Sequence, residues 1–495
     1  MATPALTIPA ADVPALLAKL RSFPRRITAD SRRIEPGVAF AAYPGAHADG
    51  RKFVPDAIAR GASAVLWEST GFTWDRNWQV PHLPIEGLQM RLGAIADFIY
   101  GSPSRDLWMV GVTGTNGKTS CAHWIGHALD ACGHRAGILG TLGNGLVGAL
   151  APASHTTTDA TTLHELLKQF KAAGATSIAM EVSSHGLEQG RVCGVKFDVA
   201  LFTNLTRDHL DYHHTMAAYG QAKARLFTWP GLRTAVINTD DPFGQSLIDA
   251  ARSRGARLLT YGLAIADIAA TSLLMSGDGM KLAVNTPWGK AEIASPMVGT
   301  FNAQNLLGVL GVMLASDIPL DTAVTAISRL HPPAGRMQRL GGSGRPLVIV
   351  DYAHTPDALE KALTALRPAV AAPGELICVF GCGGDRDPGK RAEMGHIAAR
   401  FADRVVVTSD NPRTEDPAAI ANAVARGVRD EGNRRWTIEL DRREAIHHAI
   451  SAATPCDVVL IAGKGHETYQ ESGGVRSAFS DSVESTAALS TWSTA

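Results

Sequence analysis

The chain has 495 residues, which is too long for one hydrophobic core and predicts about three domains. Its 47 Lys and Arg residues balance its 47 Asp and Glu residues, so no global charge attracts nucleic acid or an anionic membrane. The 49 glycines and the aromatic content of 6% favour an α/β enzyme with many tight turns between strands and helices.

Targeting and metal-site signals are weak along the whole sequence. The first stretch, MATPALTIPAADVPALLAKL, has no basic start and no long apolar core, which argues against a secretory signal. No segment approaches the roughly 18 apolar residues that a membrane span requires. Cys378 and Cys382 lie close together, but no second pair completes a zinc pattern. We expect a cytoplasmic, monomeric protein with reduced thiols whose partners are small molecules.

The N-terminal segment, residues 1–104, predicts a smaller α/β domain. Strand-like runs at Val38–Ala42 and Ala64–Trp67 flank an amphipathic stretch at Phe53–Arg60. The segment ends in the turn-rich sequence Gly101-Ser102-Pro103-Ser104. The boundary to the next domain is therefore expected near residue 104.

The second segment, residues 105–338, repeats a strand followed by a helical pattern. The strand-like runs are MVGVTG, SIAMEV, VALFTNL and TAVINTD. This alternation predicts a parallel sheet with helices on both faces. Residues 265–298 lack the rhythm and indicate a β-rich insertion.

The third segment, residues 339–495, resumes the alternation with PLVIVDYAH, ELICVFGCGG, RVVVTSDNP and DVVLIAGKG. Each apolar run ends in Gly, Asp or Asn, at the carboxyl end of a strand, where open α/β sheets bind ligands. The fold class expected for the whole chain is α/β with three domains.

The strongest single motif is GVTGTNGKTS, Gly111–Ser120, between a predicted strand and a predicted helix. Its glycines let backbone N–H groups surround phosphates, and the following helix adds its positive end. Lys118 would reach the β- and γ-phosphates, and the Thr119 hydroxyl would bind Mg²⁺. The standard spacing would need glycine at Val112, so the fit is imperfect. The motif nevertheless predicts ATP binding.

An acidic partner for the metal is expected at the end of a neighbouring strand. Glu181 in SIAMEVSSHG stands in such a place. Asp208, His209 and Asp211 follow the next strand, and each is either a metal ligand or a helix N-cap; the residues alone leave this open.

Polar loops in the third segment also leave two interpretations open. Ser409–Arg413 follows a strand-like run, and Pro412 ends it. Arg413 is either a solvated loop arginine or a ligand for an anion. The charges at Asp385–Asp387 are either a solvated run or part of a site, and the loop position of His354 favours function without assigning a role.

Taken together, these motifs resemble the Mur ligases, ATP-dependent amide-forming enzymes that build the peptide stem of bacterial peptidoglycan. The matching stretches run in order through all three segments: GVTGTNGKTS, MEVSSHGL, FTNLTRDHLDYH, YGQAKARLF, GTFNAQN, AGRMQ, DYAHTPDAL, FGCGGDRDPGKR, TSDNPR and AGKGHETYQ. Within the family, the chain is most similar to members that add diaminopimelate as the third residue. The resemblance implies an N-terminal domain for a uridine nucleotide, a central P-loop ATPase and a C-terminal Rossmann-like domain for the amino acid.

The resemblance also implies the nucleotide and metal sites. The expected ATP-binding residues are Gly114, Thr115, Asn116, Gly117, Lys118, Thr119, Ser120, Asn302, Asn305, Arg336 and Asp351. The expected Mg²⁺ ligands are Thr119, Glu181, His209 and a carbamylated Lys223, and Lys118, Glu181, His209 and Lys223 are expected to be catalytic. Without the resemblance, Lys223 would be an ordinary helix-surface lysine.

Two further sets are implied for the other substrates. The UDP-sugar dipeptide is expected at Ser31, Gly45, Ala46, His47, Thr156, Thr157, Ser183, Gln189 and Arg191. Diaminopimelate is expected at Arg386, Asp410, Asn411, Pro412, Arg413, Gly463 and Glu467. Thr158 stands where the family commonly has Pro or Gly, so the local turn there is expected to differ.

Three alternatives remain at this level. The first is a folylpolyglutamate-synthase-like ligase, against which the ADSR, ADGR and DNPR stretches argue. The second is the same ligase reaction with L-lysine. The third is a nucleotide-dependent binding or switch protein without ligase activity. A planar guanidinium at Arg413 favours diaminopimelate, because it recognises a second carboxylate that lysine lacks.

Overall fold

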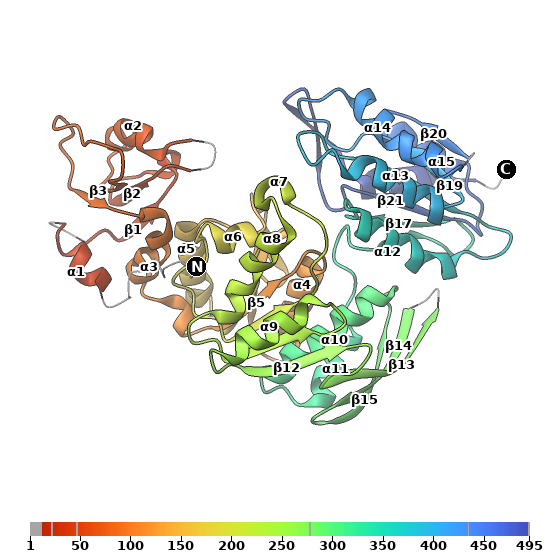
Figure 1. Cartoon of the computed structure of the whole chain (residues 1–495), viewed down its shortest axis with the longest axis horizontal. Helices are drawn as coiled ribbons and strands as arrows, with labels where there is room; N and C mark the ends of the chain where they lie inside the picture. Colours follow the sequence, from red (N-terminus) through yellow and green to blue (C-terminus); the bar gives the residue numbers. More distant parts are fainter. Residues whose placement is uncertain (1–11, 21–22, 46–47, 277–278, 434, 494–495) are drawn as a thin grey trace.

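The computed structural model describes residues 12–20, 23–45, 48–276, 279–433 and 435–493. It has parallel sheets covered by helices, which confirms the predicted α/β class. Figure 1 shows the N-terminal part and the C-terminal part at opposite ends of the long axis, with the central part between them. Within the described residues, no helix is both long enough and apolar enough to cross a lipid bilayer.

The N-terminal sheet is entirely parallel, with the strand order β1-β2-β3-β4. Its strands are β1 (Arg26–Thr28), β2 (Val38–Ala42), β3 (Ala64–Glu68) and β4 (His82–Ile85). Its helices are α1 (Val13–Leu17), α2 (Val54–Ala59) and α3 (Leu88–Tyr100), with the 3-10 turns η2 (Ser31–Arg33), η3 (Gly50–Phe53) and η4 (Pro103–Arg105). Every residue of β2 and β3 is buried, as expected for parallel strands covered on both faces.

The central sheet is the largest and places the phosphate motif near its middle. Its strand order is β15-β14-β13-β12-β11-β10-β5-β9-β6-β7-β8. The strands preceding the β-rich end are β5 (Trp108–Thr113), β6 (Ala136–Gly140), β7 (Gly143–Leu146), β8 (Ala149–Ala151), β9 (Ser177–Glu181), β10 (Val199–Phe202), β11 (Thr234–Asn238) and β12 (Arg257–Gly262). The strands β9 and β6 lie on one side of β5, and β10 lies on the other side. Successive strands are therefore added first to one side of β5 and then to the other. Such a switch point is where ligands bind in open α/β sheets.

Helices cover both faces of this sheet. They are α4 (Lys118–Ala131), α5 (Ala160–Ala172), α6 (Ser184–Glu188), α7 (Leu210–His213), α8 (Met216–Ala224), η5 (Arg225–Thr228), α9 (Phe243–Arg252), α10 (Thr300–Ala315) and α11 (Leu320–Ser328). One core lies under α4 and α10, and α10 is buried on nearly every side because its sequence is apolar all round. The other core lies under α5 and α9 on the opposite face.

The β-rich segment predicted at residues 265–298 continues this sheet. It forms β13 (Ile268–Ser276), β14 (Gly279–Thr286) and β15 (Gly289–Ser295). β13 pairs parallel with β12, and the next two strands are antiparallel. The segment therefore adds antiparallel strands to one edge of the central sheet. Short hairpins connect β13 to β14 and β14 to β15, in place of the helical crossovers that join parallel strands.

The C-terminal sheet has the order β16-β17-β21-β18-β19-β20 and is parallel except for β16. Its strands are β16 (Gln338–Gly341), β17 (Leu347–Asp351), β18 (Leu376–Phe380), β19 (Arg404–Val407), β20 (Trp436–Ile438) and β21 (Val458–Ala462), followed by the hairpin β22 (Tyr469–Ser472) and β23 (Val475–Ala478). Its helices are α12 (Pro356–Leu366), η6 (Arg367–Ala369), α13 (Lys390–Phe401), α14 (Pro417–Asp430), α15 (Arg442–Ser451) and α16 (Asp481–Thr491). Because β21 inserts beside β18, the loops after β21, β18 and β19 are neighbours at one edge.

The domain boundaries stay predictions. The first sheet ends at Ile85 and the second begins at Trp108, so residue 104 lies between them. The third sheet begins at Gln338, so the predicted division between residues 338 and 339 falls inside β16.

Candidate functional site

The phosphate motif forms a loop between β5 and α4. Gly117 caps the helix with a left-handed φ of +84°, and an added Cβ would lie 2.7 Å from Asn305 Oδ1. Glycine is therefore required there for both conformation and space. Lys118 Nζ donates to the carbonyls of Gly114 and Thr115 over 2.9 and 2.8 Å. The lysine thus lies over the loop in which a phosphate would be held.

Thr119 and Glu181 bring a hydroxyl and a carboxylate together beside this loop. The Thr119 hydroxyl donates to Glu181 Oε2 over 2.8 Å, and the backbone N–H of Thr141 donates to Oε1 over 2.7 Å. Glu181 ends β9, next to β5, which explains the meeting. Oxygen ligands of this kind suit Mg²⁺, which usually takes one or two carboxylates and completes its shell with phosphates and water. Across the described ranges, no group of three or more His, Cys, Asp or Glu side chains is arranged to hold a metal.

His209 and Lys223 both lie near the Tyr219 ring, with the His209 ring centroid and the Lys223 Nζ 6.0 and 4.3 Å from its centroid. His209 adopts a left-handed φ of +53°, which is strained for a residue with a side chain, and its Nε2 lies 3.3 Å from Asp208 Oδ2. Lys223, on α8, is 1% exposed, and its Nζ donates to the Gly114 carbonyl over 2.7 Å. Burial lowers the pKa of Lys223 well below its ordinary value, and the nearby charge of Lys118 adds to the effect.

The remaining predicted ATP residues come from both sides of a domain junction. Arg336 donates from Nη2 to Thr119 Oγ1 over 3.2 Å and stacks over the Tyr352 ring at 4.3 Å. Asp351 accepts from the backbone N–H groups of Met337 and Ala353. A cavity of about 320 Å³ is lined by these predicted residues: Thr115, Asn116, Gly117, Lys118, Thr119, Ser120, Glu181, His209, Asn302, Asn305, Arg336 and Asp351. The structure therefore brings most of the predicted nucleotide and metal residues together, whereas Gly114 and Lys223 contact each other and do not line this cavity.

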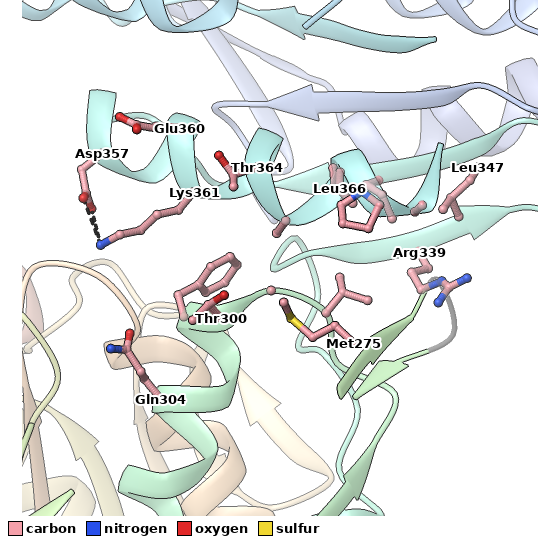
Figure 2. A pocket seen from close by; sticks show the side chains of 17 residues that line it. Met275, Thr300, Gln304, Arg339, Leu347, Asp357, Glu360, Lys361, Thr364 and Leu366 are labelled. Carbon is pink, nitrogen blue, oxygen red and sulfur yellow. Dashed lines mark hydrogen bonds and ion pairs between the residues drawn. The ribbon is translucent and has the colours of Figure 1, made fainter. Parts of the chain in front are cut away.

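A larger cavity of about 510 Å³ lies beside this one, between α10 and α12. Figure 2 shows Thr300 and Gln304 of α10 on one side, and Asp357, Lys361 and Thr364 of α12 on the other. None of the predicted site residues lines it. We therefore take the smaller cavity as the candidate catalytic site.

Four of the nine predicted UDP-substrate residues, Thr157, Ser183, Gln189 and Arg191, form a second cluster. Arg191 donates to Gln189 Oε1 over 2.9 and 2.6 Å, and to the Thr157 carbonyl over 2.8 Å. The Thr157 hydroxyl donates to the Glu181 carbonyl and accepts from the Ser183 N–H, each at 2.9 Å. This cluster therefore contacts the backbone of Glu181, the residue whose side-chain carboxylate accepts from Thr119.

The other predicted UDP-substrate residues are less well connected. Thr156 contacts Thr141 through their hydroxyls at 3.0 Å. Gly45 lies in the N-terminal part next to Tyr43 and Pro44, and Ser31 is buried at the start of η2. The contacts of the described residues do not join Ser31 to Arg191. Ala46 and His47 lie outside the described residues.

The predicted amino-acid residues lie at the carboxyl edge of the C-terminal sheet. Arg413 has a left-handed φ of +53°, its Nη1 donates to the Gly384 carbonyl over 2.7 Å, and its backbone N–H donates to Glu471 over 3.0 Å. A side chain at Gly383 would come within 2.9 Å of Arg413 Nη1 and 3.9 Å of Arg386 Cγ. The two predicted arginines therefore flank one glycine.

Lys464 is a residue that the sequence interpretation missed. It is fully buried, and its Nζ lies 2.9 Å from Asn411 Oδ1 and 2.7 Å from Glu467 Oε2. Asn411 Nδ2 also donates to Glu467 over 2.8 Å. These contacts fix two predicted residues against each other. The sequence feature that could have indicated Lys464 is its position directly after Gly463 in AGKGHETYQ, at the end of an apolar run and three residues before Glu467. A lysine that is buried at such a place is usually paired with a carboxylate.

Comparison with known families and proteins agrees with this arrangement. Residues 112–313 match the Mur ligase middle domain, residues 335–465 the Mur ligase glutamate ligase domain, and residues 25–100 the Mur ligase family catalytic domain. The chain is 50% identical over 480 residues to the UDP-N-acetylmuramoyl-L-alanyl-D-glutamate–2,6-diaminopimelate ligase of Chromobacterium violaceum, covering 97% of each chain.

Two solved structures are also similar. A UDP-N-acetylmuramoyl-L-alanyl-D-glutamate–2,6-diaminopimelate ligase has a TM-score of 0.68 and 38% identity, with 95% of each chain covered. A folylpolyglutamate synthase of Mycobacterium tuberculosis has a TM-score of 0.62 and 21% identity, covering 75% of this chain and 91% of that one, which shows a shared fold alone. The family models and the extensive identity lead to one conclusion: the chain belongs to the Mur ligase family.

Proposed function

We propose that the protein is an ATP-dependent ligase that joins meso-2,6-diaminopimelate to the D-glutamyl γ-carboxylate of UDP-N-acetylmuramoyl-L-alanyl-D-glutamate, in peptidoglycan precursor synthesis. The name of the relative with 50% identity supports this activity over folylpolyglutamate synthesis. The observation that carries the proposal is the contact between the phosphate loop and the C-terminal part: Asn116 Nδ2 donates to Asp357 over 3.1 Å. The phosphate loop is thereby in contact with the domain that carries the predicted amino-acid residues.

The chemistry proceeds in two transfers. The γ-phosphoryl group passes from ATP to a glutamyl carboxylate oxygen, and ADP leaves. The amine of diaminopimelate then attacks the carbonyl carbon of the acyl phosphate, loses a proton, and phosphate leaves from the tetrahedral intermediate. The protein contributes mainly positioning and charge neutralisation. Lys118 supplies positive charge where the phosphates gather, and Arg336 adds a second cation beside Thr119.

We propose that Thr119 and Glu181 hold Mg²⁺, with His209 lining the same cavity. Their adjacent hydroxyl and carboxylate oxygens, at 2.8 Å, fit a hard divalent cation. When bound, the ion would neutralise phosphate charge during transfer.

We further propose that Lys223 is carbamylated. Burial lowers its pKa and so favours the unprotonated amine, which attacks CO₂, forming an N–C bond and releasing a proton. The product is an anion in place of a cation beside Lys118. The monomeric state and the cytoplasmic location stay predictions.

The amino-acid site is proposed at Arg386, Asp410, Asn411, Pro412, Arg413, Gly463 and Glu467. Arg413 would bind the distal carboxylate of diaminopimelate through its planar guanidinium. The deciding assay measures product and phosphate release with ATP, Mg²⁺ and the UDP-linked dipeptide, and with either diaminopimelate or L-lysine. Product with diaminopimelate supports the proposal. Phosphate release that ignores both substrates excludes a ligase, and product with lysine alone excludes only the substrate assignment.

A further inference from the structure

A fully buried ion pair lies behind the proposed amino-acid site. Arg442 begins α15 and Asp481 begins α16, and both side chains are 0% exposed. Arg442 Nε donates to Asp481 Oδ1 over 2.7 Å, and Nη2 donates to Oδ2 over 2.8 Å. This two-pronged geometry holds the guanidinium plane in one orientation.

The remaining donors of Arg442 reach two separate strand ends. Nη1 donates to the Ser409 carbonyl over 3.2 Å, and Nη2 donates to the Ala462 carbonyl over 2.9 Å. Ser409 directly precedes Asp410, and Ala462 directly precedes Gly463. One side chain therefore ties together the starts of two loops that the proposed function assigns to the amino acid.

The sheet does not make this connection. β19 and β21 are separated by β18, so no backbone ladder joins their carboxyl ends. The spacing of the two loops is nevertheless tight, because a Cβ added to Gly463 would lie 2.5 Å from Asp410 Oδ2. A small relative shift of the loops would either close or open the space in which an amino group is expected.

We propose that Arg442, oriented by Asp481, is a positioning residue that sets the spacing of the Asp410 and Gly463 loops and thereby the affinity for the amino-acid substrate. The inference rests on the proposed function for the identity of that substrate. A buried ion pair is weak support for stability, since apolar replacements of both partners are often neutral. Its role here is geometric, because the other hydrogen bonds of Arg442 go to the residues that precede the two proposed substrate loops, Ser409 and Ala462.

The experiment compares Arg442→Lys, Asp481→Asn and their double variant with Arg443→Met. Arg443 is the next residue on the same helix and pairs with Glu484 at the surface, so it is a matched control. Each variant is assayed for the KM of diaminopimelate, ATP and the UDP-linked dipeptide, for kcat, and for melting temperature. Amide hydrogen exchange of the segments around Asp410 and Gly463 is measured without substrate.

The expected result is a rise of about tenfold or more in the KM of diaminopimelate for the two single variants, with the other KM values within about twofold. The double variant should show little further rise, because both changes remove one interaction. In the two single variants, amide hydrogen exchange should become faster at the Asp410 and Gly463 loops and stay unchanged in the phosphate loop. Arg443→Met should leave the exchange rates and the KM values unchanged.

Other results would overturn the inference. Equal rises in all three KM values indicate a general structural role, as does a lowered melting temperature with an unchanged KM for diaminopimelate. Unchanged exchange at both loops in Arg442→Lys contradicts the positioning role even if the native protein proves to use another amino acid. That last readout separates failure of this inference from failure of the proposed function.

Discussion

Asn116 in the phosphate loop donates its side-chain amide to the Asp357 carboxylate at the start of α12, although 241 positions separate them along the chain. Asp357 also pairs with Lys361 one helical turn later, at 2.9 Å. The ATP-binding loop and the domain with the proposed amino-acid site are thus in direct polar contact. Arg336 makes a second long-range contact with the start of α4, from its Nη2 to Thr119 Oγ1 over 3.2 Å.

Asp357→Ala should lower kcat about five- to tenfold, since a partly buried hydrogen bond to a charged group contributes roughly 1 kcal/mol. Steady-state kinetics with all three substrates measures this. Glu360→Ala, on the same helix and exposed, is the control and should retain kcat. A lowered melting temperature with full kcat in Asp357→Ala would show that the contact serves only the domain interface.

Glu181→Gln should reduce turnover by two orders of magnitude or more, because the amide cannot supply the carboxylate charge that a divalent cation requires (about 3 kcal/mol). The concentration of Mg²⁺ giving half-maximal activity should rise in parallel. Glu360→Gln provides a charge-matched control, because Glu360 does not line the candidate catalytic cavity. Retained turnover with an unchanged Mg²⁺ requirement would remove Glu181 from the proposed metal site.

Lys223→Ala should nearly abolish turnover, with partial recovery on addition of short carboxylic acids that occupy the place of a carbamate. Because burial lowers the pKa of Lys223, a larger share of its amine lacks a proton than in an exposed lysine, and the unprotonated amine is the form that takes up CO₂. Lys118→Ala is the comparison, since no acid should restore it. Mass spectrometry under native conditions provides an independent measurement of the added CO₂, and a lack of rescue together with an unmodified lysine would contradict carbamylation.

Arg413→Ala should raise the KM of diaminopimelate far more than that of ATP, with a loss of roughly 2–3 kcal/mol for a charge-assisted contact. The exposed Arg426 on α14 allows the same substitution as a control. Equal rises in the KM of all substrates would instead assign Arg413 a structural role, through its backbone bridge to Ser472 of β22.

The pH dependence of stability should carry a signature of His123. Burial lowers the pKa of this side chain to about 4, from an ordinary value of 6.5. The unfolded chain therefore binds the extra proton between these values, so stability falls as pH drops from about 6.5 towards 4. The loss approaches roughly 3 kcal/mol for this single group.

Melting temperatures at about pH 7.5 and about pH 5, on either side of the ordinary pKa, measure this dependence. His123→Asn should show a smaller decrease than the native protein. His448→Asn, a change at an exposed histidine, should leave the decrease as it is. An undiminished decrease in His123→Asn would show that other groups carry the acid sensitivity.

Local sequence patterns predicted several elements closely. The runs at Val38–Ala42 and Ala64–Trp67 became buried parallel strands, and Gly111–Ser120 became the end of β5, the turn after it and the start of α4. These succeed because apolar runs and glycine requirements act over a few neighbouring residues. The β-rich residues after 265 were also recognised, but their place at the edge of the central sheet depends on pairing with β12, which no local pattern specifies.

Site residues divide in the same way. Motifs predicted Thr119, Glu181 and Arg413, and the structure adds Lys464, Asp357 and Arg442 through contacts with residues far along the chain. Without the family resemblance, Lys223 would have been an ordinary surface lysine, and its burial is a property of packing alone.

The sequence by itself determined the α/β class, the phosphate loop and the polar residues that end each strand, because hydrophobic alternation and glycine placement express local backbone preferences. The tertiary structure decided which of those ends meet. Insertion of β21 beside β18 brings Asp410 and Gly463 together, and the domain contact brings Asn116 to Asp357. A side chain buried by distant neighbours acquires its charge state and its partners only when the whole chain has packed, which is why Arg442 and Lys223 could not be understood from their own surroundings in the sequence.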